Sequence, residues 1–181
     1  NVRDITNYEN PLVSYVYESG STMKTFTYMC AMEKGTYKGD DTYLSGNFKI
    51  GEDTVYDWNR TGWGTITYDK GYEYSSNVGI ANLLDRYLSK KDLKDCLTKY
   101  GFGKTTGIEL SREQDGDIKF NYPIEVATAG FGQGITTTAI QQLQALTMIA
   151  NNGRMLKPHI IDRIVDPNSG EVTYKSKTEK S

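Results

Sequence analysis

The chain has 181 residues, which suits one domain with a substantial core and leaves little room for two. It carries 21 Lys and Arg against 23 Asp and Glu, and it has no basic stripe with interleaved aromatic residues, so nucleic acid is not expected as a partner. No apolar run approaches the roughly 18 residues that a membrane-spanning helix needs, and no signal peptide is expected.

The first predicted elements are a turn, a helix and a long connection. Residues 1–20 are expected to be irregular, with a turn at Asn10–Pro11. Apolar residues then recur at helical spacing over residues 21–34, and a glycine ends the pattern. Residues 36–64 are rich in Gly, Asp and Thr, with a short strand in the stretch YLSGNFKIG. We expect this segment to be a functional loop beside an active-site cleft rather than part of the core.

Three further helices are predicted by their starting residues. One begins near Ser75, and Ser89 with Asp92 three residues later indicates the N-cap of the next. Thr138 with Gln141 opens the last one in the same way. After this helix, the C-terminal residues predict a hairpin of two strands about a Pro-Asn-Ser-Gly turn.

The cysteines and the histidine give no sign of a metal site. Cys30 and Cys96 lack CxxC spacing and lie on the apolar stripes of predicted helices. We therefore interpret them as small core residues rather than as a disulfide or a metal pair. The single histidine, His159, cannot build a histidine-based metal site, and no metal or other cofactor is expected.

A serine and a lysine stand three residues apart where glycine gives way to the first helix, in the stretch YESGSTMKTFT. Ser21 and Lys24 share one helix face at this spacing, so the amine can reach the hydroxyl. The helix start favours developing negative charge, and a lysine whose pKa is lowered by burial can act as the base for a serine nucleophile. An N-cap serine followed by a solvated lysine is the bland alternative for this common pattern.

A second polar cluster precedes the second helix, in the stretch YEYSSNVG. Ser75 supplies a hydroxyl that can relay a proton between the lysine and a leaving group. Asn77 supplies an amide that can hold the lysine and grip a substrate amide. Helix capping is the ordinary alternative here too.

These motifs, taken in order, resemble the transpeptidase domain of a class B, monofunctional penicillin-binding protein. YESGSTMKTFT is similar to the family's Y-E-P-G-S-T-x-K, and SSNVG to its S-x-N motif. GFGKTTGIEL resembles G-F-G-x-x-T-G-I-x-L, and AGFGQGITTTAIQQLQALTMIANNG resembles the stretch S-F-G-Q-G-I-x-V-T-P-L-Q-L ending in A-N-G-G. The similarity covers roughly residues 5–166.

The resemblance implies an α+β fold of the serine transpeptidase and β-lactamase type, here the helical side with the start of the antiparallel sheet. It implies that Ser21 is the acyl-accepting nucleophile, Lys24 its general base, and Ser75 with Asn77 the second-motif pair. The implied reaction is D,D-transpeptidation of peptidoglycan stem peptides ending in D-Ala-D-Ala, with β-lactam antibiotics as mimics of the donor. Protein partners in division or elongation complexes are also implied. The implied location is the extracytoplasmic face of the bacterial cell membrane, with an anchor outside these residues.

The sequence departs from the family pattern in three places. Ser19 stands where the family usually has proline, and Ala139–Ile140 replaces Pro-Leu. The third family motif, a lysine followed by Thr or Ser and then Gly on a strand, is missing after residue 154. Lys104–Gly107 is not this motif, because it precedes the G-Q-G stretch and has one residue too many. Residues 1–181 are therefore expected to be a partial transpeptidase domain that is poorly active alone.

Two other functions remain as alternatives at this stage. A β-lactamase or a penicillin-sensor domain shares the S-x-x-K motif and a serine in the second motif. A non-catalytic scaffold of a cell-wall assembly is the alternative from a different class, although both Ser21 and Lys24 are intact.

Overall fold

The computed structural model describes residues 8–181, so part of the predicted irregular N-terminal segment lies outside the described residues. The chain divides into two compact units, each assembled from separate stretches of sequence. The helical unit contains Glu18–Lys99 and Asp117–Thr136. The second unit contains Tyr100–Gly116, Thr137–Ser181 and the described residues up to Tyr17.

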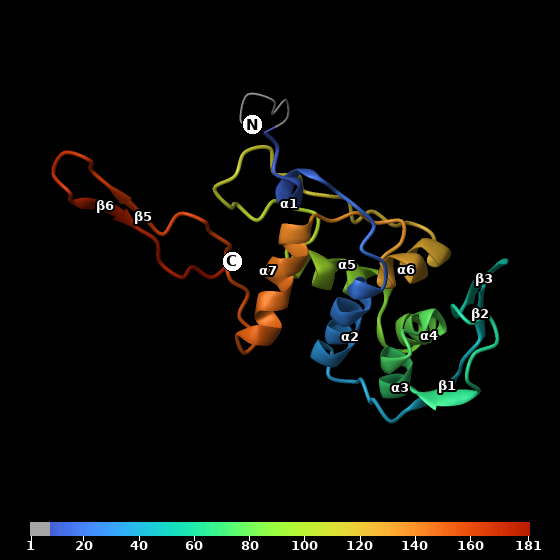
Figure 1. Ribbon diagram of the computed structural model, residues 1–181. Helices are drawn as coiled ribbons and strands as arrows, with labels where there is room; N and C mark the ends of the chain where they lie inside the picture. The colour runs from blue at the N-terminus through green and yellow to red at the C-terminus, as the bar shows by residue number, and fades with distance from the viewer. Residues whose placement is uncertain (1–7) are drawn as a thin grey trace. The chain divides into compact units, whose positions relative to one another are not determined.

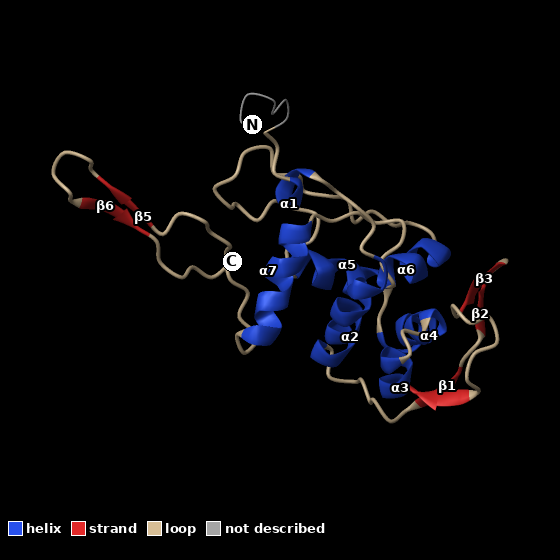
Figure 2. Ribbon diagram, viewed as in Figure 1, coloured by secondary structure: helices blue, strands red, loops and turns tan. Residues whose placement is uncertain are grey.

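The helical unit contains most of the regular structure, coloured by type in Figure 2. Its elements in chain order are the 3-10 helix η2 (Gly20–Thr22), α2 (Met23–Glu33), β1 (Thr42–Leu44), β2 (Asn47–Ile50), β3 (Asp53–Tyr56), β4 (Thr65–Thr67), α3 (Tyr68–Glu73), α4 (Asn77–Tyr87), α5 (Lys90–Lys99) and α6 (Pro123–Gly130). α2 contacts α4, α5 and α6 (Figure 1), and most of its residues are buried. The unit therefore has a helical core whose central element is α2.

Side-chain caps start the helices of this unit where the sequence places polar residues. Ser76 Oγ accepts a hydrogen bond from the backbone N–H of Gly79 at 2.7 Å and begins α4. The predicted cap of α5 is confirmed, because Asp92 accepts from the N–H of Ser89 at 2.9 Å and donates its own N–H to Ser89 Oγ at 3.1 Å.

Cys30 and Cys96 form a disulfide, which corrects the prediction that they are unpaired core residues. Their predicted positions on apolar stripes are confirmed in part, since Cys30 is buried and Cys96 is half-buried. The two stripes belong to α2 and α5, which pack together and bring the two Cα atoms to 5.9 Å, a usual distance for a disulfide. The stripes were visible in the sequence, but the pairing of the helices was not.

The predicted loop over residues 36–64 contains two antiparallel ladders. β2 pairs with β3, which places Phe48 opposite Val55, and β1 pairs with β4, which lies just beyond the predicted loop. Most of these residues are exposed or half-buried, yet Tyr43, Val55 and Asp57 are buried. The segment therefore contributes to the core of the helical unit, contrary to the expectation that it stands apart from it.

Two helices of this unit were not predicted. α3 begins at Tyr68, where Thr67 Oγ1 accepts from the N–H of Lys70 at 3.1 Å. α6 begins at Pro123, which is a favourable first residue for a helix. Both are short, at 6 and 8 residues, so neither shows a full apolar repeat in the sequence.

The second unit has α1 (Pro11–Ser14), α7 (Ala139–Ala150), β5 (Arg163–Val165) and β6 (Val172–Lys175). α1 is a short helix at the position of the predicted turn, and it contacts α7. The predicted start of α7 is confirmed by a capping box between Thr138 and Gln141. The C-terminal hairpin is also confirmed, with β5 antiparallel to β6 and both strands exposed (Figure 1).

Buried Gln141 joins three segments of the second unit. Its Nε2 donates to the carbonyls of Lys104 and Asp115, each at 2.7 Å, and its Oε1 accepts from the N–H of Thr138 at 2.9 Å. A buried amide is stable when its polar atoms are bonded in this way. Within residues 8–181, no helix is both long enough and apolar enough to cross a membrane.

Candidate active site

Ser21 lies in the 3-10 helix that leads into α2, and it is exposed. The backbone beside it is fixed by a close contact between two glycines. Gly20 donates its N–H to the carbonyl of Gly132 at 2.9 Å, and a Cβ on Gly132 would lie 2.1 Å from the Gly20 oxygen. Only glycine at position 132 allows this approach, which leaves the serine hydroxyl accessible at a helix start.

Lys24 is buried, with 2% of its surface exposed, as the sequence analysis predicts for a catalytic base. Its Nζ donates to the backbone carbonyl of Ser75 at 2.6 Å and to Ser75 Oγ at 3.0 Å. Burial lowers the pKa of Lys24 to about 8, while the negative charge of Asp57 opposes this shift. The lysine therefore has a larger neutral fraction near pH 7 than an exposed lysine has.

Ser75 reaches Lys24 from a strained turn between α3 and α4. Its φ of 54° is in the left-handed region, which a non-glycine residue adopts at a cost of roughly 1–3 kcal/mol. The backbone N–H of Ser75 donates to the carbonyl of Tyr72 at 3.0 Å and holds the turn. In this conformation both the carbonyl and the hydroxyl of Ser75 accept from Lys24.

Asp57 was missed by the sequence analysis, and it is the buried carboxylate beneath this turn. Its Oδ1 accepts from Ser76 Oγ at 2.7 Å and from the N–H of Val78 at 3.1 Å, and its Oδ2 accepts from the N–H of Gly46 at 2.8 Å. Asp57 thus joins the start of α4 to the β1–β2 connection, and its charge acts on Lys24. In the sequence it is one aspartate among several in a Gly- and Asp-rich segment, so no local pattern marks it.

Asn77 is the first residue of α4 and is half-buried. Its Nδ2 donates to the carbonyl of Tyr56 at 3.2 Å, so the amide is bonded to β3. The hydrogen bonds of Lys24 go to Ser75, which corrects the expectation that Asn77 also holds the lysine.

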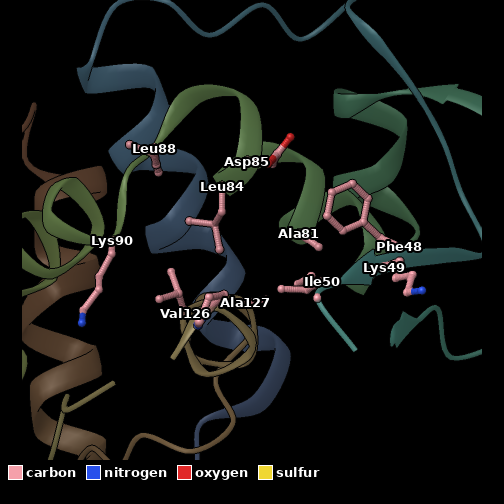
Figure 3. A pocket seen from close by; sticks show the side chains of 12 residues that line it. Phe48, Lys49, Ile50, Ala81, Leu84, Asp85, Leu88, Lys90, Val126 and Ala127 are labelled. Atoms are coloured by element: carbon pink, nitrogen blue, oxygen red, sulfur yellow. The ribbon is translucent and has the colours of Figure 1, made fainter. Parts of the chain in front are cut away.

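A pocket of about 400 Å³ lies elsewhere in the helical unit, between the β2–β3 hairpin and helices α4 and α6 (Figure 3). Its apolar side chains include Leu84 from α4 and Val126 and Ala127 from α6. None of the four predicted site residues lines it. Among residues 8–181, no group of three or more His, Cys, Asp or Glu side chains is arranged to hold a metal ion.

The arrangement supports proton transfer between hydroxyls and an amine. An exposed serine precedes a buried lysine by one helical turn, and a second hydroxyl contacts the lysine nitrogen. A neutral lysine in such a site can accept the proton of a serine hydroxyl. The helical core with small antiparallel ladders and this serine–lysine pair define a protein of the serine transpeptidase and β-lactamase fold class.

Comparison with known proteins identifies the family within that class. The model of the penicillin-binding protein transpeptidase domain matches residues 1–181, and the chain belongs to this family. Stage V sporulation protein D of Bacillus subtilis is 35% identical over 164 residues, covering 88% of this chain and 25% of the relative. Peptidoglycan D,D-transpeptidase FtsI of Escherichia coli is 28% identical over 172 residues, covering 91% of this chain and 28% of the relative.

Solved structures agree with this assignment. Penicillin-binding protein 2X of Streptococcus thermophilus superposes with a TM-score of 0.88 at 34% identity, covering 96% of this chain and 26% of the other. Penicillin-binding protein 3 of Mycobacterium tuberculosis, solved with aztreonam, gives 0.83 at 30% identity, covering 94% and 39%. The resemblance to class B penicillin-binding proteins is thus confirmed, and the chain spans about a quarter of the length of the curated relatives described above.

Proposed function

We propose that this chain forms the serine–lysine part of a peptidoglycan D,D-transpeptidase. The observation that carries the proposal is the burial of Lys24 with its nitrogen held by Ser75. Among residues 8–181, no carboxylate lies at hydrogen-bond distance from Lys24 Nζ, so burial of this lysine has a free-energy cost, and a role as a base explains why it is placed there. Relatives named as D,D-transpeptidases support the choice of reaction.

In the proposed reaction, Ser21 Oγ attacks the carbonyl carbon of the penultimate D-Ala of a stem peptide, and its proton passes to Lys24 Nζ. The tetrahedral intermediate collapses when the C–N bond breaks, and the proton reaches the departing D-Ala amine through the Ser75 hydroxyl. An amine of a second stem peptide then attacks the carbonyl carbon of the Ser21 ester and loses its proton to Lys24. When the C–O bond to the serine breaks, Lys24 returns this proton to Ser21 Oγ. The backbone N–H of Ser21 supplies one donor for the oxyanion. Asn77 binds a substrate amide.

β-Lactams are proposed to acylate the same serine. Penicillin-binding protein 3 of Mycobacterium tuberculosis has been solved with aztreonam and with ampicillin, which supports this ligand class. We also propose a location on the extracytoplasmic face of the cell membrane, with an anchor outside these residues and with partners in a division or elongation complex. The Cys30–Cys96 disulfide supports this location, since disulfides persist in oxidising compartments.

The third family motif is proposed to lie outside residues 1–181, so that this segment is a partial domain and poorly active alone. The coverage of the curated relatives, about a quarter of their length, supports this view. The motif strand would add the second oxyanion donor, whose loss costs about 10²–10³ in rate. Equal acylation by penicillin of residues 1–181 and of a version extended by about a hundred residues would contradict the proposal.

The test of function is labelling with a fluorescent penicillin, using protein expressed from its complete reading frame. We expect Ser21→Ala to abolish labelling and Lys24→Met to reduce it by several orders of magnitude. Ser19→Ala is the matched control, because the buried Ser19 hydroxyl has no hydrogen-bond partner among the described residues. Labelling that survives in Ser21→Ala would refute the assignment of the nucleophile, and rapid release of the label would indicate a β-lactamase.

A further inference from the structure

A groove of about 350 Å³ begins at Asn77, two residues after Ser75, and runs along the end of β3. One wall consists of β3 and the turn after it, and the other of α6 and the turn after that helix. The side chains that matter for recognition are Tyr56, Trp58, Arg60, Asn77, Thr128 and Gln133. We call this the Arg60 groove. All of it lies within the helical unit.

Arg60 is presented by a turn whose backbone is tightly held. Its N–H donates to the carbonyl of Asp57 at 2.9 Å, and its φ of 67° is in the left-handed region that arginine seldom adopts. Asn59 braces the same turn, since its Nδ2 donates to the carbonyl of Gly62 at 3.1 Å and its Oδ1 accepts from the Gly62 N–H at 2.9 Å. The arginine is therefore fixed at its backbone, which lowers the entropy lost when its side chain binds a ligand.

The Arg60 groove has one charge that is free to meet a ligand, and it is positive. No carboxylate forms an ion pair with Arg60 in the part of the chain that the structure describes, and its guanidinium stands 5.2 Å from the centre of the Tyr56 ring. The other charged residue of the lining, Asp57, is buried and accepts hydrogen bonds on both oxygens. A guanidinium in this situation matches a carboxylate, to which it can donate two parallel hydrogen bonds.

The neutral residues of the groove suit a peptide. Asn77 uses its Nδ2 in the bond to Tyr56, and its Oδ1 remains able to accept from a peptide N–H. Gln133 is exposed on the opposite wall and offers both a donor and an acceptor. Trp58 is 69% exposed, and its indole is held in place by a hydrogen bond from Nε1 to the carbonyl of Tyr74 at 3.0 Å. A fixed and exposed indole is a typical surface for ligand contact.

We propose that the Arg60 groove binds the stretch of the peptide substrate next to the reacting D-alanine, and that Arg60 selects peptides with a free carboxylate in that stretch. The inference rests on the proposed function, because it takes Ser21 as the acylated residue. It adds a specificity determinant outside the serine–lysine pair and the second motif. A neutral form of the same peptide, with a carboxamide in place of the carboxylate, leaves the guanidinium unpaired.

The test uses two peptide thioesters that end in a D-alanyl thioester and differ only in one preceding side chain, which carries a carboxylate or the matching carboxamide. The acylation rate constant kcat/KM at Ser21 is measured by mass spectrometry, with protein expressed from its complete reading frame. We expect wild type to favour the carboxylate donor by about twofold to fivefold, the range for an exposed charged pair. Arg60→Gln should reduce this ratio to near one, and Arg60→Lys should give an intermediate value.

Lys49→Gln is the matched control, because Lys49 is on β2, the strand paired with β3, and lines the separate pocket shown in Figure 3. It should keep the wild-type ratio. Equal rates for the two donors in wild type, or an unchanged ratio in Arg60→Gln, would overturn the proposal. Acylation by benzylpenicillin separates the two hypotheses: if it labels Ser21 normally while the ratio is one, only the Arg60 inference fails. If it labels no variant at Ser21, the proposed function fails and the inference fails with it.

Discussion

Replacement of Asp57 by asparagine tests how the buried carboxylate supports the site. The side chain keeps its shape, but one oxygen becomes an NH₂ group. The carboxylate now accepts three hydrogen bonds, two on Oδ1 and one on Oδ2. The most favourable orientation of asparagine keeps its oxygen between Ser76 and Val78 and turns the NH₂ group toward the N–H of Gly46. A donor then faces a donor.

The magnitude follows from these contacts. A buried N–H without an acceptor costs about 1–3 kcal/mol, and the two remaining bonds lose the contribution of a charged acceptor. We therefore expect Asp57→Asn to lower the free energy of unfolding by about 2–4 kcal/mol. Asp53→Asn is the control, since Asp53 is exposed at the start of β3, the strand that precedes Asp57, and should change stability by less than about 0.5 kcal/mol. Urea unfolding of both variants measures the difference, and equal values for the two would refute this account.

The same substitution changes the pH dependence of acylation. The charge of Asp57 raises the pKa of Lys24 against the larger effect of burial, which brings it to about 8. Without that charge the pKa falls further, so the neutral base is available at lower pH. The ascending limb of kcat/KM against pH, measured with benzylpenicillin, should therefore move to lower pH in Asp57→Asn. A limb that stays in place or moves upward would show that Asp57 does not act on the lysine.

Three further predictions concern stability. Burial lowers the pKa of Lys24 from 10.5 to about 8, so the unfolded chain binds more protons than the folded chain between those pH values. The stability of wild type relative to Lys24→Met should therefore rise by about 3 kcal/mol as pH increases through that window, and a stability difference that is the same at all pH values in urea unfolding would contradict this. Reduction of the disulfide between Cys30 and Cys96, which are 66 residues apart, should lower the free energy of unfolding by about 2–4 kcal/mol, measured with and without reductant, and no change would show that the unfolded chain is not constrained. Gly132→Ala should lower the free energy of unfolding by about 2–4 kcal/mol, because its Cβ would lie 2.1 Å from a backbone oxygen. Gly153 has a similar φ with open space around it, so Gly153→Ala should lower the free energy of unfolding by only about 1–2 kcal/mol, and equal values for the two variants in thermal or urea unfolding would mean that the contact at Gly132 is loose.

The sequence predicted the parts of the fold that are written in short local patterns. The caps at Ser89 and Thr138 place hydroxyls where the first N–H groups of a helix need acceptors, and both helices begin there. Ser21 and Lys24 were predicted as a pair because a separation of three residues on a helix brings side chains to one face. The structure confirms the predicted burial of Lys24. Ser75 was recognised through its motif, and the structure places it on the lysine nitrogen.

The remaining features depend on contacts between distant segments. The disulfide requires that α2 and α5 pack with two particular turns in register, which neither stripe specifies by itself. Asp57 is important because Gly46, Ser76 and Val78 converge on it from other parts of the chain. The short helices α3 and α6 are stabilised by packing against α4 more than by any repeat of their own. Such features arise from tertiary structure and leave little trace in a local pattern.

The shorter of the two Lys24 contacts goes to a main-chain carbonyl and not to a side chain. Alanine scanning would therefore give a misleading view of position 75, since Ser75→Ala keeps this contact and removes only the hydroxyl. Glycine at the same position would even relieve the strain of a φ of 54°. The contact that holds the Lys24 amine is thus encoded in the shape of a turn, and a change in the length of that turn would disturb this contact more than any single substitution at residue 75.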